Sequence, residues 1–261
     1  MRLPRVLVDV DGVLADFLAP SLPLLKELTG RDWNLSEFHS WDIFDTVDRQ
    51  FEDEFFDRIN CLGWCRNIPV FEGAQEAMAR VAELADVYVV TSPMNHIPTW
   101  MHEREQWLKA HFNISPKKVV HTSAKYLCTG DVLIDDKPAN VDAWLEEQPG
   151  IGILFPQPYN QRMTSRGLRA KNWGDVIKVI EHLNTTQKFK AGRFGGLSVA
   201  PLTKGKFSFP GGFNLYGWLS VTVTFKDGQK IELYGRAAID FIGQLERGGW
   251  KPVDTPSRET T

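Results

Sequence analysis

The sequence predicts an α/β fold, with a doubly wound parallel sheet followed by a small β-rich module. Short apolar, β-branched runs alternate with helical patterns through the first 185 of the 261 residues, which is typical of repeated strand–helix units. Polar residues directly follow these runs, at the end of the sheet where such folds bind ligands. The charge balance changes sign near residue 186, which indicates that a second domain begins there.

Five runs are predicted as strands, at residues 6–10, 87–90, 119–121, 132–134 and 151–155. Between them, one helical pattern places five residues on a single stripe, namely Trp100, Arg104, Trp107, Leu108 and His111. Another helix is expected to begin at Pro138, because proline favours the first turn. Strands and helices that alternate in this way predict a parallel sheet with helices on both faces.

Two domains are expected, at residues 1–185 and 186–261. The first holds 19 Lys and Arg against 27 Asp and Glu, a net charge of −8, and the second holds 11 against 6, a net charge of +5. In the second, the runs at 218–225 and 230–234 flank an Asp227-Gly228 turn and predict a hairpin. A helix at 236–247 completes a ββα-like module. Its basic charge allows contact with nucleic acid, but packing or homo-oligomerisation is the favoured interpretation.

The composition is that of an ordinary soluble globular protein, with 43% apolar residues. No apolar run approaches the ~18 residues of a membrane span, and the first predicted strand leaves no room for a signal peptide before it. We therefore expect a cytoplasmic protein without a membrane partner. The three cysteines, Cys61, Cys65 and Cys128, suit neither a disulfide framework nor a zinc site, so buried free thiols are expected.

The first predicted strand runs into Asp9 and Asp11, whose side chains lie on the same side because strand residues alternate between faces. One carboxylate can then attack while its neighbour handles a proton. Taken alone, the segment fits a hairpin equally well, since Asp11-Gly12 between apolar residues is a strong turn signal. The residues that follow the other predicted strands favour the chemical interpretation.

Those residues are Thr91 and Ser92, Lys125, and the pair Asp135 and Asp136. Each has a structural explanation by itself, as a helix entry, a solvated lysine or a helix cap. Together they make chemical sense, because carboxylates ~4 Å apart repel by about 4 kcal/mol and need a lysine and a divalent cation. Hard oxygen ligands select Mg²⁺, and hydroxyl and backbone donors would hold phosphate oxygens. An acid, a metal and a lysine around a phosphate describe phosphoryl transfer to a nucleophilic aspartate.

These segments resemble the four motifs of the haloacid dehalogenase-like phosphohydrolases. Among these enzymes they are most similar to the 5′(3′)-deoxyribonucleotidases, or type C 5′-nucleotidases. The resemblance covers about residues 4–183 and includes Pro69-x-x-Glu72-Gly73-Ala74, Tyr159-Asn160 and Trp173. Asp11 argues against a dehalogenase, because expelling a halide needs no proton donor at that place.

The resemblance implies a role for each motif residue. Asp9 would be the nucleophile that becomes an aspartyl-phosphate, and Asp11 would protonate the leaving alcohol and then activate water. Mg²⁺ would be held by the Asp9 carboxylate, the Asp11 backbone carbonyl and Asp136, with Asp135 in support. The phosphate would be bound, and its developing charge neutralised, by Thr91, Ser92 and the catalytic Lys125.

Enzymes of this kind carry a helical cap after the first motif, which here would span about residues 17–70. Nine aromatic residues lie between positions 17 and 64. Of these, Phe51 and Phe55 have helical spacing with Ile59 and predict the core face of a cap helix. Aromatic faces also stack nucleobases, and four residues are candidates for a substrate pocket: Phe17, Trp33, Trp41 and Phe44.

The expected substrate is therefore a small phosphate ester, in particular a (deoxy)ribonucleoside monophosphate. One alternative is a phosphatase that acts on 3′-phosphate ends of nucleic acid or on another small phosphate ester, guided by the basic second domain. A more remote alternative is a non-catalytic scaffold that binds a partner, against which the intact set of four motifs argues.

Overall fold

The computed structural model describes residues 3–189, together with residues 198–199, 204–208, 214–218, 220–224 and 230–234. The chain divides into two compact units, Met1–Lys190 and Ala191–Thr261. The last helix of the first unit, α6 (Trp173–Phe189), runs past the boundary expected at residue 185, because the polar residues at 184–187 continue the helix.

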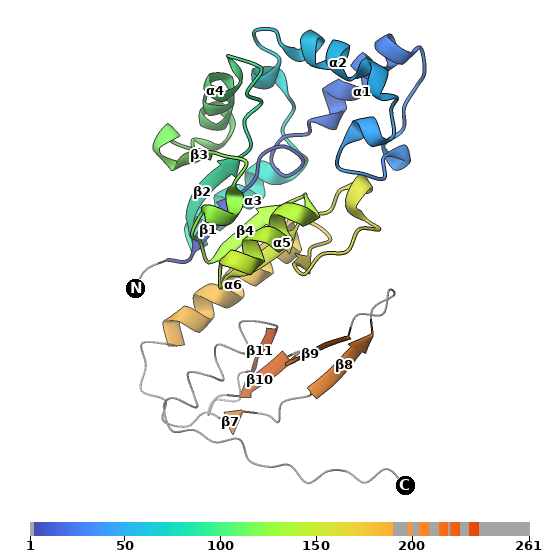
Figure 1. Cartoon of the computed structure of the whole chain (residues 1–261). Coiled ribbons are helices and arrows are strands. Elements are labelled where there is room, and N and C mark those ends of the chain that lie inside the picture. Colours follow the sequence, from blue (N-terminus) through green and yellow to red (C-terminus); the bar gives the residue numbers. More distant parts are fainter. Residues whose placement is uncertain are drawn as a thin grey trace. The chain divides into compact units, whose positions relative to one another are not determined.

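The first unit is built on six parallel strands in the order β3-β2-β1-β4-β5-β6 (Figure 1). Their bounds are Arg5–Val8 (β1), Asp86–Thr91 (β2), Val119–His121 (β3), Val132–Asp135 (β4), Ile151–Leu154 (β5) and Leu168–Arg169 (β6). The predicted α/β fold is confirmed. The hairpin alternative at Asp11-Gly12 is wrong, because β1 pairs in parallel with β2 and β4. β6 is absent from the sequence prediction because two exposed residues show no periodicity.

The order of the strands places a ligand site beside β1. From β1 the chain builds β2 and β3 on one side, then returns to build β4, β5 and β6 on the other. The side on which new strands are added to the sheet therefore changes between β1 and β4. In open sheets of this kind, ligands bind at the carboxyl ends of the strands at that point. The backbone N–H of Asp9 donates to the carbonyl of Ile134 at 2.9 Å, which keeps the two strand ends together.

Helices cover both faces of the sheet. Alternate residues of β1 point to opposite sides, so Val6 and Val8 enter the main core while Leu7 enters a smaller one with Trp144. The smaller core belongs to α5 (Pro138–Glu147). The main core is built with α6 and two further helices, α3 (Ala74–Leu84) and α4 (Trp100–Phe112).

A helical segment is inserted between β1 and α3. The chain leaves the core at Asp16 and returns at Pro69, where the N–H of Asp16 donates to the carbonyl of Pro69 at 2.9 Å. The insertion contains α1 (Leu18–Thr29), α2 (Glu52–Ile59) and short 3-10 turns. On α2 the buried residues are Phe55 and Ile59, as their spacing predicts, but Phe51 precedes the helix in a 3-10 turn and is only partly buried. The Phe55 ring lies 5.4 Å from that of Phe44 in an edge-on arrangement.

The described residues of the second unit form two antiparallel sheets, one of three strands and one of two. β10 (Ser220–Thr224) pairs with β11 (Lys230–Tyr234), the two arms of the predicted hairpin, and with β7 (Ser198–Val199). β8 (Lys204–Ser208) pairs with β9 (Asn214–Trp218), so Trp218 belongs to β9 rather than to the strand expected at 218–225. The Asp227-Gly228 turn and the helix expected at 236–247 lie outside the described residues.

The cysteines differ in their exposure. Cys65 is buried and Cys128 is partly buried, but Cys61 is exposed in the segment that follows α2, so the expectation of buried thiols is wrong for Cys61. All three are free. In the part of the chain that the structure describes, none of the helices is long and apolar enough to cross a membrane.

Candidate active site

Three acidic side chains meet at the point where the strand order reverses. Asp9 follows β1, Asp135 ends β4 and Asp136 comes next; each is buried and offers a carboxylate oxygen within 4.8 Å of the others. The sequence predicts this meeting, because the carboxyl ends of neighbouring parallel strands lie at the same edge of the sheet. Without a counter-charge the cluster would be strongly destabilised.

Lys125 supplies part of that counter-charge. It begins a 3-10 turn, Lys125–Leu127, and its side chain is only 2% exposed. Its Nζ lies 2.7 Å from Asp9 Oδ2 and 2.7 Å from Asp135 Oδ2. Burial lowers the pKa of Lys125, but the charges of Asp135 and Asp9 outweigh burial and the pKa is raised overall. The ammonium group therefore stays charged between the two carboxylates.

Burial has the largest effect on the pKa of the two acids, Asp9 and Asp136, that line the cavity. It raises the pKa of Asp9 to about 7, against the opposing effect of Lys125 and with a further rise from Asp135. The pKa of Asp136 is raised well above its ordinary value, first by burial and then by the charges of Asp135 and Asp9. Lys125 alone therefore does not offset the cost of burying both acids in their charged form.

The hydrogen bonds show which carboxylate oxygens are free to bind a metal. Both oxygens of Asp135 are engaged, by Lys125 and by the backbone N–H of Lys137 and the amide of Asn140. Asp136 Oδ2 accepts from the hydroxyl of Tyr159, whereas Asp136 Oδ1 is buried and without a hydrogen-bond partner in the described part of the chain. A buried, unpaired carboxylate oxygen beside other acids fits a hard divalent cation such as Mg²⁺.

Gly12 lies in the loop that follows β1 and allows this loop to pack closely against Asp136 and Tyr159. It adopts a φ of +76°, and a Cβ added there would come within 2.8 Å of Asp136 Oδ2 and 2.7 Å of the Tyr159 hydroxyl. Its carbonyl accepts a hydrogen bond of 2.6 Å from the amide of Gln157. The position therefore requires glycine for both its backbone conformation and its close contacts.

Thr91 and Ser92 lie where the sequence predicts, at the end of β2, and both line the cavity. The hydroxyl of Thr91 is buried and without a hydrogen-bond partner in the described residues. Such a hydroxyl can donate to an oxygen of a bound anion.

Asp11 is the one motif residue whose carboxylate lies outside the cluster of three. Its Oδ1 accepts a hydrogen bond of 2.6 Å from Nη2 of Arg104. Helical periodicity predicts Arg104 on the apolar stripe of a helix but predicts no role for its side chain. The sequence does contain a signal for such a role. Arg104 is a charged residue on the stripe that faces the core, and a buried cation needs an anionic partner.

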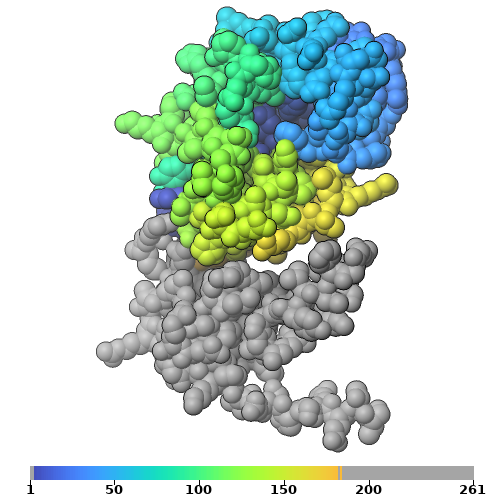
Figure 2. Space-filling model, in the orientation of Figure 1, coloured from blue at the N-terminus to red at the C-terminus, as the bar shows by residue number. Residues whose placement is uncertain are grey.

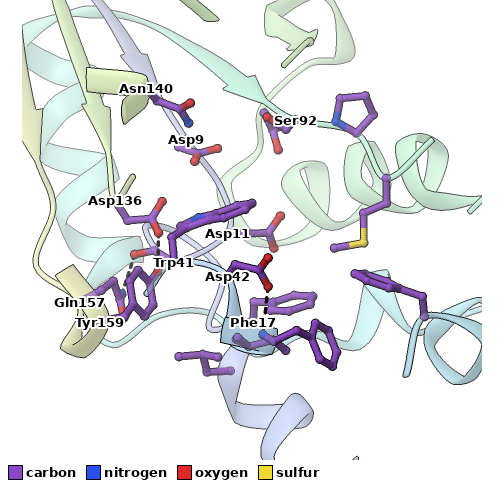
Figure 3. Close-up of a pocket in the computed structure, with 18 of the residues that line it drawn as sticks. Asp9, Asp11, Phe17, Trp41, Asp42, Ser92, Asp136, Asn140, Gln157 and Tyr159 are labelled. Carbon is purple, nitrogen blue, oxygen red and sulfur yellow. Dashed lines mark hydrogen bonds between the residues drawn. The ribbon is translucent and has the colours of Figure 1, made fainter. Parts of the chain in front are cut away.

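A cavity of about 440 Å³ opens above the cluster. In Figure 2 the surface is hollowed between the light-blue insertion and the green core, and Figure 3 shows Asp9, Asp11 and Asp136 around the cavity with Trp41 and Phe17 from the insertion. Aromatic rings form much of its wall: Phe17, Trp41, Phe44, Phe55, Phe56 and Tyr159. The polar residues of its lining include Asp42, Asn95, His96, Asn140 and Gln157.

Of the four aromatic residues predicted for a pocket, the structure brings Phe17, Trp41 and Phe44 into the cavity and leaves Trp33 outside. The prediction for Trp33 is corrected, because its partners lie elsewhere on the insertion. Its indole N–H donates to Thr29 Oγ1 at 2.9 Å and the Arg31 guanidinium lies 4.2 Å from its ring centroid. Trp41 is instead held to the core by Lys137, whose Nζ lies 3.4 Å from its ring centroid.

The Tyr159-Asn160 pair, which the sequence indicates only through its resemblance to the family, supports Asp136. Besides the hydroxyl of Tyr159, the amide of Asn160 donates to the Asp136 carbonyl at 2.7 Å and to the Phe155 carbonyl at 2.8 Å. These contacts orient the strand end that carries Asp136. The contacts with Asp136 span 23 and 24 positions of sequence, so local patterns do not predict them.

A doubly wound sheet with a helical insertion after β1, and with acids and a lysine gathered at its strand ends, defines a phosphatase of the haloacid dehalogenase-like class. The family model described as "5′ nucleotidase, deoxy (Pyrimidine), cytosolic type C protein" matches residues 3–188. The chain belongs to this family. The match ends shortly before the second unit, which begins at Ala191.

The chain is also similar to named relatives and to a solved structure. The chain is 30% identical over 184 residues to the 5′(3′)-deoxyribonucleotidase of Bacillus subtilis, covering 67% of this chain and 97% of that protein. It is 29% identical over 205 residues to the mitochondrial 5′(3′)-deoxyribonucleotidase of Mus musculus, covering 69% and 86%. A haloacid dehalogenase-like family hydrolase from Xanthomonas campestris superposes with a TM-score of 0.42 at 16% identity, covering 72% of this chain and 99% of that one.

Proposed function

We propose that this protein removes the phosphate from (deoxy)ribonucleoside monophosphates, with Mg²⁺ as cofactor and an aspartyl-phosphate on Asp9 as intermediate. Relatives named 5′(3′)-deoxyribonucleotidase support the substrate class. The buried cluster of Asp9, Asp135 and Asp136 supports the cofactor.

The observation that carries the proposal is that one cavity has both a charged floor and an aromatic wall. Asp9, Thr91 and Lys125 line it on the core side, and Phe17 and Phe44 line it on the side of the insertion. A phosphate bound at the floor places the rest of its ester against the rings. Rings of this kind stack well on a nucleobase.

In the first step an Asp9 carboxylate oxygen attacks phosphorus and the bond from phosphorus to the ester oxygen breaks. Asp11, protonated at the start of this step, gives its proton to that leaving oxygen, and the nucleoside departs as an alcohol. In the second step the Asp11 carboxylate takes a proton from water, the resulting oxygen attacks phosphorus, and the bond to Asp9 breaks. Phosphate is released and Asp11 is protonated again.

Thr91, Ser92 and Lys125 bind the phosphate oxygens in both steps, and their charge and donors are already in place before the reaction begins. Asp9 and Asp136 would hold the metal, with Asp135 and its hydrogen bonds in support. When bound, Mg²⁺ supplies positive charge that offsets the repulsion between the acids and the phosphate.

The test is a phosphatase screen with deoxyribonucleoside and ribonucleoside monophosphates, phosphosugars and a 3′-phosphorylated oligonucleotide, with Mg²⁺ or with excess chelator. We expect Mg²⁺-dependent release of phosphate, fastest from the mononucleotides. Borohydride reduction during turnover should trap the intermediate at Asp9, which mass spectrometry detects. Hydrolysis that survives the chelator, or a preference for phosphosugars or oligonucleotides, would contradict the proposal.

A further inference from the structure

Arg104 is a buried cation that touches the cavity only through Asp11. It lies on α4, its side chain is 0% exposed, and it is absent from the residues that line the cavity. Its Nη2 donates to Asp11 Oδ1 at 2.6 Å. Asp11 itself lines the cavity with its side chain 28% exposed.

The surroundings of Arg104 direct its charge to that one carboxylate. Its guanidinium lies between two indole rings, 5.1 Å from the centroid of Trp100 and 5.4 Å from that of Trp107. Its Nε and Nη1 are buried and without hydrogen-bond partners in the described part of the chain. An arginine that served only to connect elements would use more of its five donors.

Stability alone is a poor reason for this arrangement. Burying an ion pair costs desolvation of both groups, and well-packed apolar residues in its place are often as stable or more stable. Here the cation is buried completely, and two of its three nitrogens have no hydrogen-bond partner among the residues that the structure describes. A role in the reaction explains why a charged residue is present at this buried position, whereas packing does not.

Asp11 has no other hydrogen-bond partner for its side chain among the described residues. Asp9, by contrast, is held by Lys125 and by its hydrogen bond from the N–H of Val10 at 2.7 Å. Asp9 and Asp11 therefore pair with different cations. Lys125 pairs with the acid that attacks, and Arg104 pairs with the acid that transfers the proton.

We propose that Arg104 is the positioning residue of the proton-transfer step, an inference that rests on the proposed function. By binding Oδ1, Arg104 turns Oδ2 of Asp11 toward the leaving oxygen. When the proton moves from Oδ2 to that oxygen and the phosphorus–oxygen bond breaks, the negative charge left on Asp11 lies against the guanidinium. The same contact then holds the carboxylate in place to take a proton from water.

The proposal predicts that the importance of Arg104 depends on the leaving group. A nucleoside alkoxide is a poor leaving group and needs the proton as the bond breaks. Nitrophenolate leaves readily without one. Replacing Arg104 should therefore slow the transfer of phosphate from a nucleotide much more than from p-nitrophenyl phosphate, whereas general damage to the site would slow both equally.

The experiment measures kcat/KM, which reports the steps through the first phosphoryl transfer, for the full chain with Mg²⁺ on both esters. We expect Arg104→Met to lower kcat/KM about 10²-fold on a nucleoside monophosphate, the scale of a general-acid contribution, and less than about threefold on p-nitrophenyl phosphate. Arg104→Lys, which keeps the charge, should recover much of the loss on the nucleotide. It also serves as the test if Arg104→Met does not fold.

Glu103→Gln is the matched control on the same helix. Glu103 is also buried, and its carboxylate accepts from the N–H groups of Gly63 at 3.0 Å and Arg66 at 3.2 Å rather than pairing with Asp11 or Arg104. This variant perturbs the packing of α4 against the insertion and should change kcat/KM on the two esters by the same factor.

A double-mutant cycle with Asp11→Asn completes the test. If Arg104 acts through Asp11, adding Arg104→Met to Asp11→Asn should cost no further activity on the nucleotide. Equal losses on both esters in Arg104→Met and Arg104→Lys, or a full additional loss in the double variant, would overturn the inference. A wild-type protein that hydrolyses neither ester with Mg²⁺ would instead refute the proposed function.

Discussion

The floor and the wall of the cavity are built by different means. The floor consists of charged groups at the ends of β1 and β4, almost completely buried and tied together through Lys125. The wall consists of rings from the insertion, such as Phe44 and Phe55, which are held by contact with one another. Polar contacts have strict distances and angles, whereas apolar packing tolerates exchange of similar shapes. We therefore expect the floor to determine the reaction and the wall to determine what is bound.

The largest effect should come from the floor residue that forms the covalent bond. Asp9→Asn removes the nucleophile and should lower kcat at least ~10²-fold, with little change in KM. The fold should survive, because the substitution removes one of three clustered negative charges. Phosphate release and thermal unfolding measure the two effects. Activity close to that of the wild type would show that the floor does not carry the reaction.

Lys125→Ala should come next. Removing one preorganised cation costs roughly 3 kcal/mol of transition-state stabilisation, about 10² in rate, and it leaves Asp9 and Asp135 without their shared partner. The matched control is Lys118→Ala, since Lys118 pairs with Asp86 at the surface with its side chain 45% exposed. Exposed pairs contribute little, so this control should keep the wild-type kcat. Equal rates in the two variants would show that Lys125 does not contribute to the reaction.

The acids of the floor should make Mg²⁺ binding depend on pH. Burial raises the pKa of Asp9 to about 7 in the metal-free protein, and the metal must displace the proton. Mg²⁺ affinity should therefore fall about tenfold from pH 8 to pH 6 and change little above pH 8. Calorimetric titration at several pH values measures it, and an affinity equal at pH 6 and pH 8 would contradict the raised pKa.

The same pKa has a consequence for stability. Because the pKa of Asp9 is higher in the folded chain than its ordinary value of 3.8, the metal-free folded protein binds more protons than the unfolded one between about pH 4 and pH 7. Asp9 therefore makes folding less favourable as the pH rises through that window. Mg²⁺ should raise the melting temperature more at pH 8 than at pH 5.5.

The smallest effect should come from the wall. Trp41 lines the cavity whereas Trp33 does not, so the two form a matched pair. Trp41→Ala should raise KM for a nucleotide about fivefold, near the lower end of what base stacking contributes, with kcat little changed. Trp33→Ala should leave KM unchanged. A larger effect of Trp33→Ala on KM than of Trp41→Ala would mean that the wall does not select the substrate.

Much of the floor could be predicted from the sequence because it depends on local features. An apolar run followed by polar residues identifies the end of a strand, and parallel strands bring their carboxyl ends to one edge. That reasoning is sufficient to bring Asp9, Lys125 and Asp136 together. The wall is harder to predict, because the spacing of aromatic residues on the insertion does not distinguish a ring that faces the cavity from one that packs elsewhere.

The chain by itself determined the α/β sheet, the polar residues at its strand ends and the change of charge near residue 186, since periodicity and composition are properties of neighbouring residues. Only the tertiary structure decided that Trp33 turns away from the cavity and that Trp41 meets Lys137. It alone brought Arg104 to Asp11 across 93 positions of sequence. Such contacts depend on how whole helices pack, and no local pattern encodes that distance.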